Sequence, residues 1–263
     1  MILKPCKALL VMLVAASGLS RSSFAQNPSN WSYGAFNGPA YWAQEFPTSS
    51  CGAATGQSPI PIPIIQPTTL PKIEFGYNSA TFLVENINYA TEILAPTASG
   101  SPTNSITLNG DTYNLVQIHF HFPAEHTLPG VQNAVMETHF VHQDANNNIL
   151  VIAVLAIIGD PTNQYVGSIW KNLPTSYGGH GSVTINPKML LPEEGNNSDK
   201  LNYYTYQGSL TTPPCSAGVT WLVLQKQIKV TEDWLKAATC NTFPNARPIQ
   251  NQSPAPTVEL SNF

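Results

Sequence analysis

Two short segments of the sequence place histidines at alternate positions, a spacing that suits a metal site on a β-sheet. In residues 117–121, with the sequence QIHFH, polar and apolar residues alternate. Glu137 and His139 are spaced in the same way in the second segment. Because successive side chains of a strand point to opposite faces, the polar side chains of each segment share one face. If the two strands are neighbours, His119, His121 and His139 converge.

Three neutral imidazoles that leave a fourth position open are typical of a catalytic zinc site, whereas structural sites fill all four positions, usually with cysteine. The sequence has no Cys-x-x-Cys pair. A ligating imidazole also needs an acceptor for its second ring nitrogen. Gln117 and Glu137 each lie two positions before a histidine, His119 and His139, so we expect them to act as these acceptors. The remaining histidines, which lie off these polar faces and to which we assign no chemistry, are His126, His142 and His180.

Two other interpretations of this pattern remain open. His119-x-His121-x3-Glu125, followed by Gly130, is similar to a cupin motif, which would hold iron or manganese for oxygen chemistry. A cupin leaves the second segment, with Glu137, unexplained. The other interpretation is a non-catalytic zinc-binding module. Metal analysis distinguishes a cupin from a zinc site, and activity measurements distinguish a non-catalytic zinc-binding module from an enzyme.

The elements that must position these residues are short strands. Only 10% of the residues are charged, against roughly 25% in an average soluble protein, and 23 prolines and 17 glycines interrupt the chain. Helical periodicity is convincing only in residues 166–173 and 232–238. We therefore expect a mainly β (α+β) single domain, with a large, mostly antiparallel twisted sheet and a few short peripheral helices. The predicted strands, which are rich in β-branched and aromatic residues, cover 81–84, 115–122, 135–142, 149–158 and 219–224.

Residues 1–25 have the features of a secretory signal peptide. Two lysines precede an apolar stretch, residues 8–19, and small residues at 23 and 25 suit cleavage after Ala25. The apolar stretch is shorter than the roughly 18–20 residues that a membrane span needs. We therefore expect a mature domain of residues 26–263, with its core at about 31–256, exported to a periplasm or out of the cell and without a membrane anchor.

The charge and the cysteines suit an exported domain that does not bind nucleic acid. Cleavage removes three basic residues and no acidic one, which leaves 8 basic and 15 acidic residues and a net charge of −7. Cys51, Cys215 and Cys240 remain, and two of them are expected to pair in an oxidising compartment. Cys240 is either a buried apolar residue or a link between subunits.

Further motifs occur in a fixed order between residues 31 and 256. They are Trp31-Ser32-Tyr33-Gly34, Gly56-Gln57-Ser58-Pro59-Ile60, Glu125-His126-Thr127, Ser209-Leu210-Thr211-Thr212-Pro213-Pro214, Val219-Thr220-Trp221 and Asn245-Ala246-Arg247-Pro248. Together with the two histidine segments, they resemble the α-class carbonic anhydrases, in particular the secreted bacterial type. The resemblance extends over nearly the whole mature chain. It implies zinc-dependent, reversible hydration of CO2 to bicarbonate and a proton.

The resemblance also implies a role for each matching residue. Thr211 would accept a hydrogen bond from a zinc-bound hydroxide and donate its own to Glu125. A disulfide would join Cys51 to Cys215, and the Ser58–Pro59 and Pro213–Pro214 bonds would be cis. The implied zinc ligands are His119, His121 and His139, supported by Gln117, Glu137 and the backbone of Asn245. The implied CO2 pocket consists of Val141, Val154, Leu210, Thr212, Val219 and Trp221.

One position departs from the family pattern. The site that holds a proton-shuttling histidine in fast members aligns with Asn88, and an amide cannot carry a proton at pH 7. We therefore expect proton export to limit turnover. His180, in a Gly-Gly-His-Gly segment, is only a remote candidate for the shuttle. Secreted bacterial relatives are often dimers, so a homodimer is possible.

Overall fold

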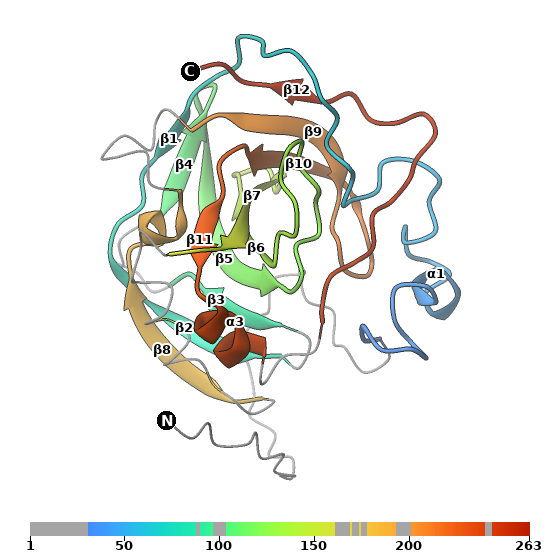
Figure 1. Cartoon of the computed structure of the whole chain (residues 1–263), viewed down its shortest axis with the longest axis horizontal. Coiled ribbons are helices and arrows are strands. Elements are labelled where there is room, and N and C mark those ends of the chain that lie inside the picture. Colours follow the sequence, from blue (N-terminus) through green and yellow to red (C-terminus); the bar gives the residue numbers. More distant parts are fainter. Residues whose placement is uncertain are drawn as a thin grey trace.

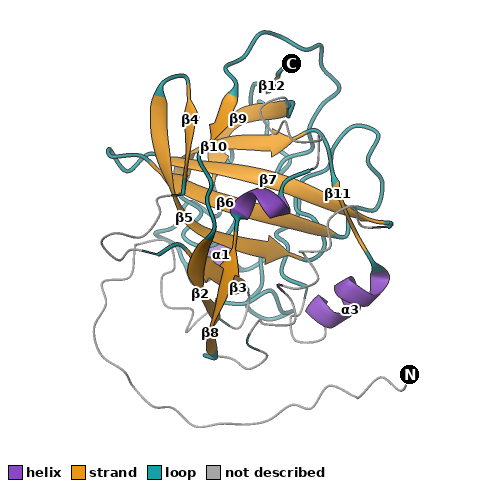
Figure 2. Ribbon diagram, turned by 90° about the vertical axis from the view of Figure 1, so that its left-hand side faces the viewer, coloured by secondary structure: helices purple, strands orange, loops and turns teal. Residues whose placement is uncertain are grey.

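The strands of this protein join into one large twisted sheet. The computed structural model describes residues 31–87, 90–96, 104–160, 169, 174, 178–192, 201–239 and 244–263. Twelve strands form the sheet, whose central path runs β12-β9-β10-β7-β6-β5-β3-β2-β8 (Figures 1 and 2). The strands are β1 (Ile73–Phe75), β2 (Ala80–Asn86), β3 (Thr91–Leu94), β4 (Ser105–Leu108), β5 (Asp111–His121), β6 (Met136–Gln143), β7 (Ile149–Ile158), β8 (His180–Ile185), β9 (Tyr203–Ser209), β10 (Ala217–Leu224), β11 (Ile228–Val230) and β12 (Glu259–Leu260).

Most neighbouring strands are antiparallel, as expected. Only β7 pairs in parallel among the described strands, with β10 and with β11. Helices are few and peripheral in the described part of the chain: α1 (Trp42–Glu45), α3 (Glu232–Thr239) and the 3-10 turn η1 (Pro187–Leu190). The predicted fold class is therefore confirmed. No helix among the described residues is both long and apolar enough to span a membrane.

The five predicted strands correspond to parts of β2, β5, β6, β7 and β10, and the predicted helix at 232–238 corresponds to α3. The other predicted helix, at 166–173, lies outside the described residues except for Ile169. The strands that the sequence did not indicate are mostly two to four residues long, too short for a period of two to be visible. β9 is longer, but its sequence YYTYQGS is largely polar or aromatic.

The two faces of the sheet bury different apolar clusters. On one face, Ile118, Phe140 and Ile152 belong to the larger cluster. On the other, Val141 and Trp221 belong to the cluster that surrounds the histidines. A third, small cluster contains Trp31 and Trp42 and includes the disulfide between Cys51 and Cys215, which lie 164 positions apart in the sequence. The disulfide is thus present, whereas Cys240 lies outside the described residues.

Candidate metal centre

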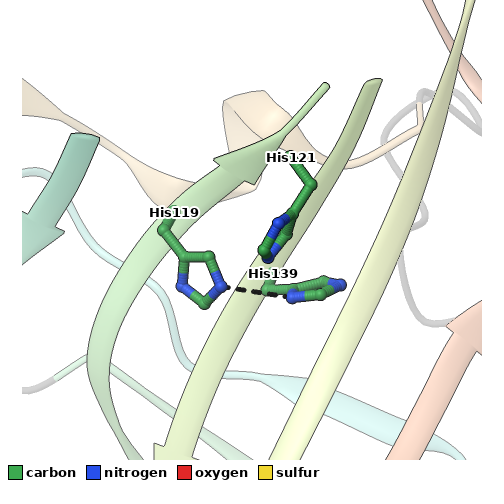
Figure 3. A group of neighbouring side chains, drawn as sticks. All are labelled: His119, His121 and His139. Carbon is green, nitrogen blue, oxygen red and sulfur yellow. Dashed lines mark hydrogen bonds between the residues drawn. The ribbon is translucent and has the colours of Figure 1, made fainter. Parts of the chain in front are cut away.

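The register between β5 and β6 brings the three expected histidines together. His119 lies directly opposite His139, and His121 lies opposite Glu137. One nitrogen from each of the three imidazoles lies within 4.8 Å of the others. His139 Nδ1 is 3.2 Å from His119 Nε2 (Figure 3). Two adjacent strands therefore build the cluster, and the rings of His119 and His121 on β5 face the ring on β6.

The second nitrogen of each ring contacts an oxygen that fixes its proton. His119 Nδ1 lies 2.6 Å from Gln117 Oε1, and His121 Nδ1 lies 2.7 Å from the backbone oxygen of Asn245. His139 Nε2 lies 2.8 Å from Glu137 Oε1. Because a neutral imidazole donates from one nitrogen only, the three nitrogens that face one another carry lone pairs. His121 Nε2 is buried without a hydrogen-bond partner among the described residues.

Burial keeps these imidazoles neutral. It lowers the pKa of His121 to about 4, although the hydrogen bond to the Asn245 backbone and the charge of Glu137 raise it. Burial also lowers the pKa of His119, well below the ordinary value, and that of His139. Three converging lone pairs in a buried site repel one another, and a cation removes that repulsion. The donor set of three nitrogens, with no thiolate, fits Zn²⁺.

His126 supports the cluster, although its sequence position gave no sign of it. Its Nδ1 lies 2.6 Å from Glu137 Oε1, and its backbone N–H donates to Glu137 Oε2 at 2.7 Å. Its Nε2 lies 2.7 Å from the hydroxyl of Tyr206. Burial alone would raise the pKa of Glu137, but His126 and His139 lower it well below its ordinary value. His126 therefore helps to keep the partner of His139 ionised. Its loop has no strand periodicity from which the role could be predicted.

Glu125 lies next to the cluster and is held by the backbone of the chain's C-terminal part. Its Oε1 accepts a hydrogen bond from the Arg247 N–H at 2.7 Å. Burial raises the pKa of Glu125 to about 7, while His139, the Arg247 N–H and the Thr211 side chain oppose the increase. Glu125 Oε2 has no hydrogen-bond partner of normal geometry among the described residues. Thr211 itself is nearly buried and lines the pocket above the histidines.

The pocket at the cluster is apolar on one side. Four of the six residues expected in it, Val141, Leu210, Thr212 and Trp221, do line it. Val219 belongs to the same apolar cluster but is not among the lining residues. The residues that line the pocket without having been expected there are Tyr33, Ala90, Glu92 and Val151.

Val154 was expected in the pocket but does not line it. In the register it lies opposite Thr138, whereas Ala153 lies opposite His139. Its side chain therefore points to the other face of the sheet, where it is packed in the larger cluster with Ile152. Val151, three positions earlier and on the face of His139, lies in the pocket instead. β7 is apolar on both faces, so its sequence does not show which valines face the site.

The remaining residues of interest lie away from the three imidazoles. His142 points to the far face of β6, where its Nε2 lies 2.7 Å from the hydroxyl of Tyr77. His180 is exposed at the start of β8 and makes an ion-pair contact with Glu85. Asn88 lies outside the described residues. Cis bonds precede Pro59 and Pro214, at the two positions where the resemblance implied them.

Comparison with known proteins finds carbonic anhydrases as relatives of this chain. Residues 37–253 match the family model of eukaryotic-type carbonic anhydrases. A carbonic anhydrase of Neisseria gonorrhoeae is 35% identical over 251 residues, covering 93% of this chain and 90% of that protein. One from Pectobacterium carotovorum is 30% identical over 233 residues, with 87% and 90% covered.

Among solved structures, the α-carbonic anhydrase of Thermovibrio ammonificans, in complex with the inhibitor sulfanilamide, is similar with a TM-score of 0.76. It is 30% identical, and the match covers 88% of this chain and 98% of that one. The family model covers residues 37–253, and the likeness in structure extends over 88% of the chain. This chain therefore belongs to the α-class carbonic anhydrase family.

Proposed function

We propose that this enzyme binds one Zn²⁺ ion through His119, His121 and His139 and uses it for the reversible hydration of CO2 to bicarbonate and a proton. The observation that carries the proposal is the convergence of three lone-pair nitrogens within 4.8 Å, one of them buried without a protein partner. Such a set needs a cation and leaves a fourth position open. Bound zinc lowers the pKa of a water to about 7, an established property of carbonic anhydrases, and so supplies a nucleophile near neutral pH.

The residues around the metal position each have a separate task. Gln117, the Asn245 carbonyl and Glu137 hold the three rings in the tautomer that presents lone pairs to the ion. Thr211 orients the nucleophile: its side chain interacts with the Glu125 carboxylate, and Glu125 Oε1 is held by the Arg247 N–H.

The apolar side of the pocket suits a small, non-polar substrate. Val141, Val151, Leu210 and Trp221 lie beside the imidazoles and present no polar group that CO2 would have to displace. CO2 can therefore lie next to the metal without being a ligand, and the charged product bicarbonate is poorly held by the same wall. This asymmetry favours release of the product after each turnover.

The two alternatives have less support. In a cupin, Glu125 would be a fourth ligand, but neither of the two groups of described residues that could hold a metal contains it: one is His119, His121 and His139, the other His126, Glu137 and His139. A zinc-binding module without catalysis would not need Thr211 and Glu125 beside the ion.

Metal analysis tests the proposed ion. Protein purified without added metal should contain about one zinc and no iron per chain, and His121→Ala should lose most of the zinc. Ser182→Ala, far from the centre on β8, is the matched control and should keep its zinc. Iron at stoichiometric level, or full zinc content in His121→Ala, would contradict the proposal.

A further inference from the structure

A row of polar side chains crosses the sheet from the metal centre to the edge strand β8. His139 on β6 lies opposite His119 on β5, which lies opposite Glu92 on β3. Glu92 lies opposite Glu85 on β2, and Glu85 lies opposite His180 on β8. Directly opposed residues of antiparallel strands share a face of the sheet. Figure 1 shows β5, β3, β2 and β8 following one another in this order.

The outer end of the row is an exposed histidine oriented by a carboxylate. His180 Nδ1 lies 3.3 Å from Glu85 Oε1, and the side chain of His180 is 61% exposed against 20% for Glu85. The carboxylate favours a proton on Nδ1, because that nitrogen faces the negative charge. Nε2 then keeps its lone pair and can accept a proton. Histidine is the side chain that ordinarily takes up and releases protons near neutral pH.

The inner end of the row opens into the pocket. Glu92 lines it together with His119, and its Oε1 accepts a hydrogen bond from Gln117 Nε2 at 3.2 Å. On this face, among the described residues of β2, β3 and β8, the charged side chains besides His180 are Glu85 and Glu92, both acidic. Two carboxylates on opposed positions repel each other, so this strip attracts positive charge.

We propose that His180 accepts the proton released by CO2 hydration and transfers it to buffer. Glu85 is its positioning residue, and Glu92 keeps the path between them negative. The proposal rests on the proposed function, because hydration releases one proton in each turnover. Three strand spacings of about 4.8 Å separate His119 from His180, or roughly 15 Å, so the proton must pass through water along the row.

Each proton that His180 accepts is passed on to a buffer molecule. The proton that leaves the reacting water forms an N–H bond at Nε2, and the ring becomes an imidazolium beside Glu85. A buffer base then breaks this bond at the exposed edge of the sheet and restores the neutral ring. Asn88, at the position where faster relatives are expected to hold a histidine, cannot carry out such a step because an amide does not titrate near pH 7.

The first test uses His180→Gln, which keeps a polar side chain but cannot carry a proton. In weak buffer, kcat should fall on the order of tenfold, because general acid–base groups contribute about a hundredfold or more and this one is distant. The value of kcat/KM should not change, and imidazole should restore kcat. Ser182→Ala, two residues along β8 on the same face, is the matched control and should behave like the wild type.

The second test measures directly which nitrogen of the His180 ring carries the proton. Nitrogen NMR of the zinc-loaded wild type at alkaline pH should show the His180 proton on Nδ1, and Glu85→Gln should lose this preference and part of kcat. The proposal is overturned if His180→Gln keeps wild-type kcat in every buffer, or if kcat and kcat/KM fall together. A wild type without hydration activity would instead contradict the proposed function, while the NMR result would still report on the His180–Glu85 contact.

Discussion

Each imidazole of the centre is held by a different kind of acceptor: an amide oxygen, a backbone carbonyl and a carboxylate. Gln117 and Glu137 could be predicted from the sequence, because a residue two positions before a strand histidine shares its face. Asn245 could not be derived from spacing, since it lies 124 positions from His121. Only the family resemblance indicated it. His126 was missed because its contact depends on how a loop folds over Glu137.

Removing the hydroxyl of Thr211 tests whether the centre is catalytic. In Thr211→Ala we expect kcat/KM for CO2 hydration to fall on the order of a hundredfold, the usual cost of losing one positioned hydrogen bond at a reacting group. Thr211→Ser keeps the hydroxyl and should retain most of the activity. Zinc content should be unchanged in both variants. An alanine variant within twofold of the wild type would show that Thr211 does not orient the nucleophile.

At the scale of elements, β5, β6 and β7 determine which side chains reach the site. The alternation in β5 was readable because its two faces differ in polarity. The faces of β7 could not be separated, since all ten of its residues are apolar and the seven at 150–156 are buried on both faces. Val154 was therefore expected in the pocket although its side chain points to the other face of the sheet, whereas Val151 lines the pocket. Short strands such as β3, which supplies Glu92, were not visible in the sequence.

Paired substitutions on β7 test this assignment of faces. Val154→Ala should lower the free energy of unfolding by about 1–3 kcal/mol through the cavity it leaves, with kcat/KM unchanged. Val151→Phe should fill the pocket and lower kcat/KM by about tenfold or more, because it displaces the substrate. Denaturant unfolding and stopped-flow rates measure the two effects. Equal losses of kcat/KM in both variants would mean that both side chains face the site.

On the far face of β6, the buried His142 makes the free energy of unfolding depend on pH. Burial lowers the pKa of His142 to about 3, so the folded protein leaves it neutral while the unfolded chain protonates it below about pH 6.5. Between these values stability falls as pH falls, by up to about 1.4 kcal/mol per pH unit. The variant Tyr77→Phe/His142→Phe should lose this part of the slope in unfolding experiments at equal zinc content. Tyr77→Phe alone should keep it, and identical slopes for all three proteins would contradict the assignment.

At the scale of the whole molecule, distant segments are tied together around the site. The Arg247 guanidinium donates to Ser58 O at 2.6 Å and to Cys51 O at 3.1 Å, while its backbone N–H holds Glu125. The disulfide attaches Cys51 to Cys215, four residues beyond Thr211. Figure 1 shows how the C-terminal segment, in red, returns past the N-terminal blue segments. Such long-range contacts cannot be read from local periodicity, whereas a disulfide was expected because an exported domain meets an oxidising compartment.

Stopped-flow CO2 hydration by the purified protein tests the central claim, that three imidazoles on two adjacent strands hold a zinc ion that catalyses this hydration. The zinc-loaded protein should accelerate hydration far above the buffer rate. A chelator that removes the metal should abolish the acceleration, and one equivalent of zinc should restore it. A zinc-loaded protein no faster than buffer, or a rate that survives complete removal of the metal, would contradict the claim.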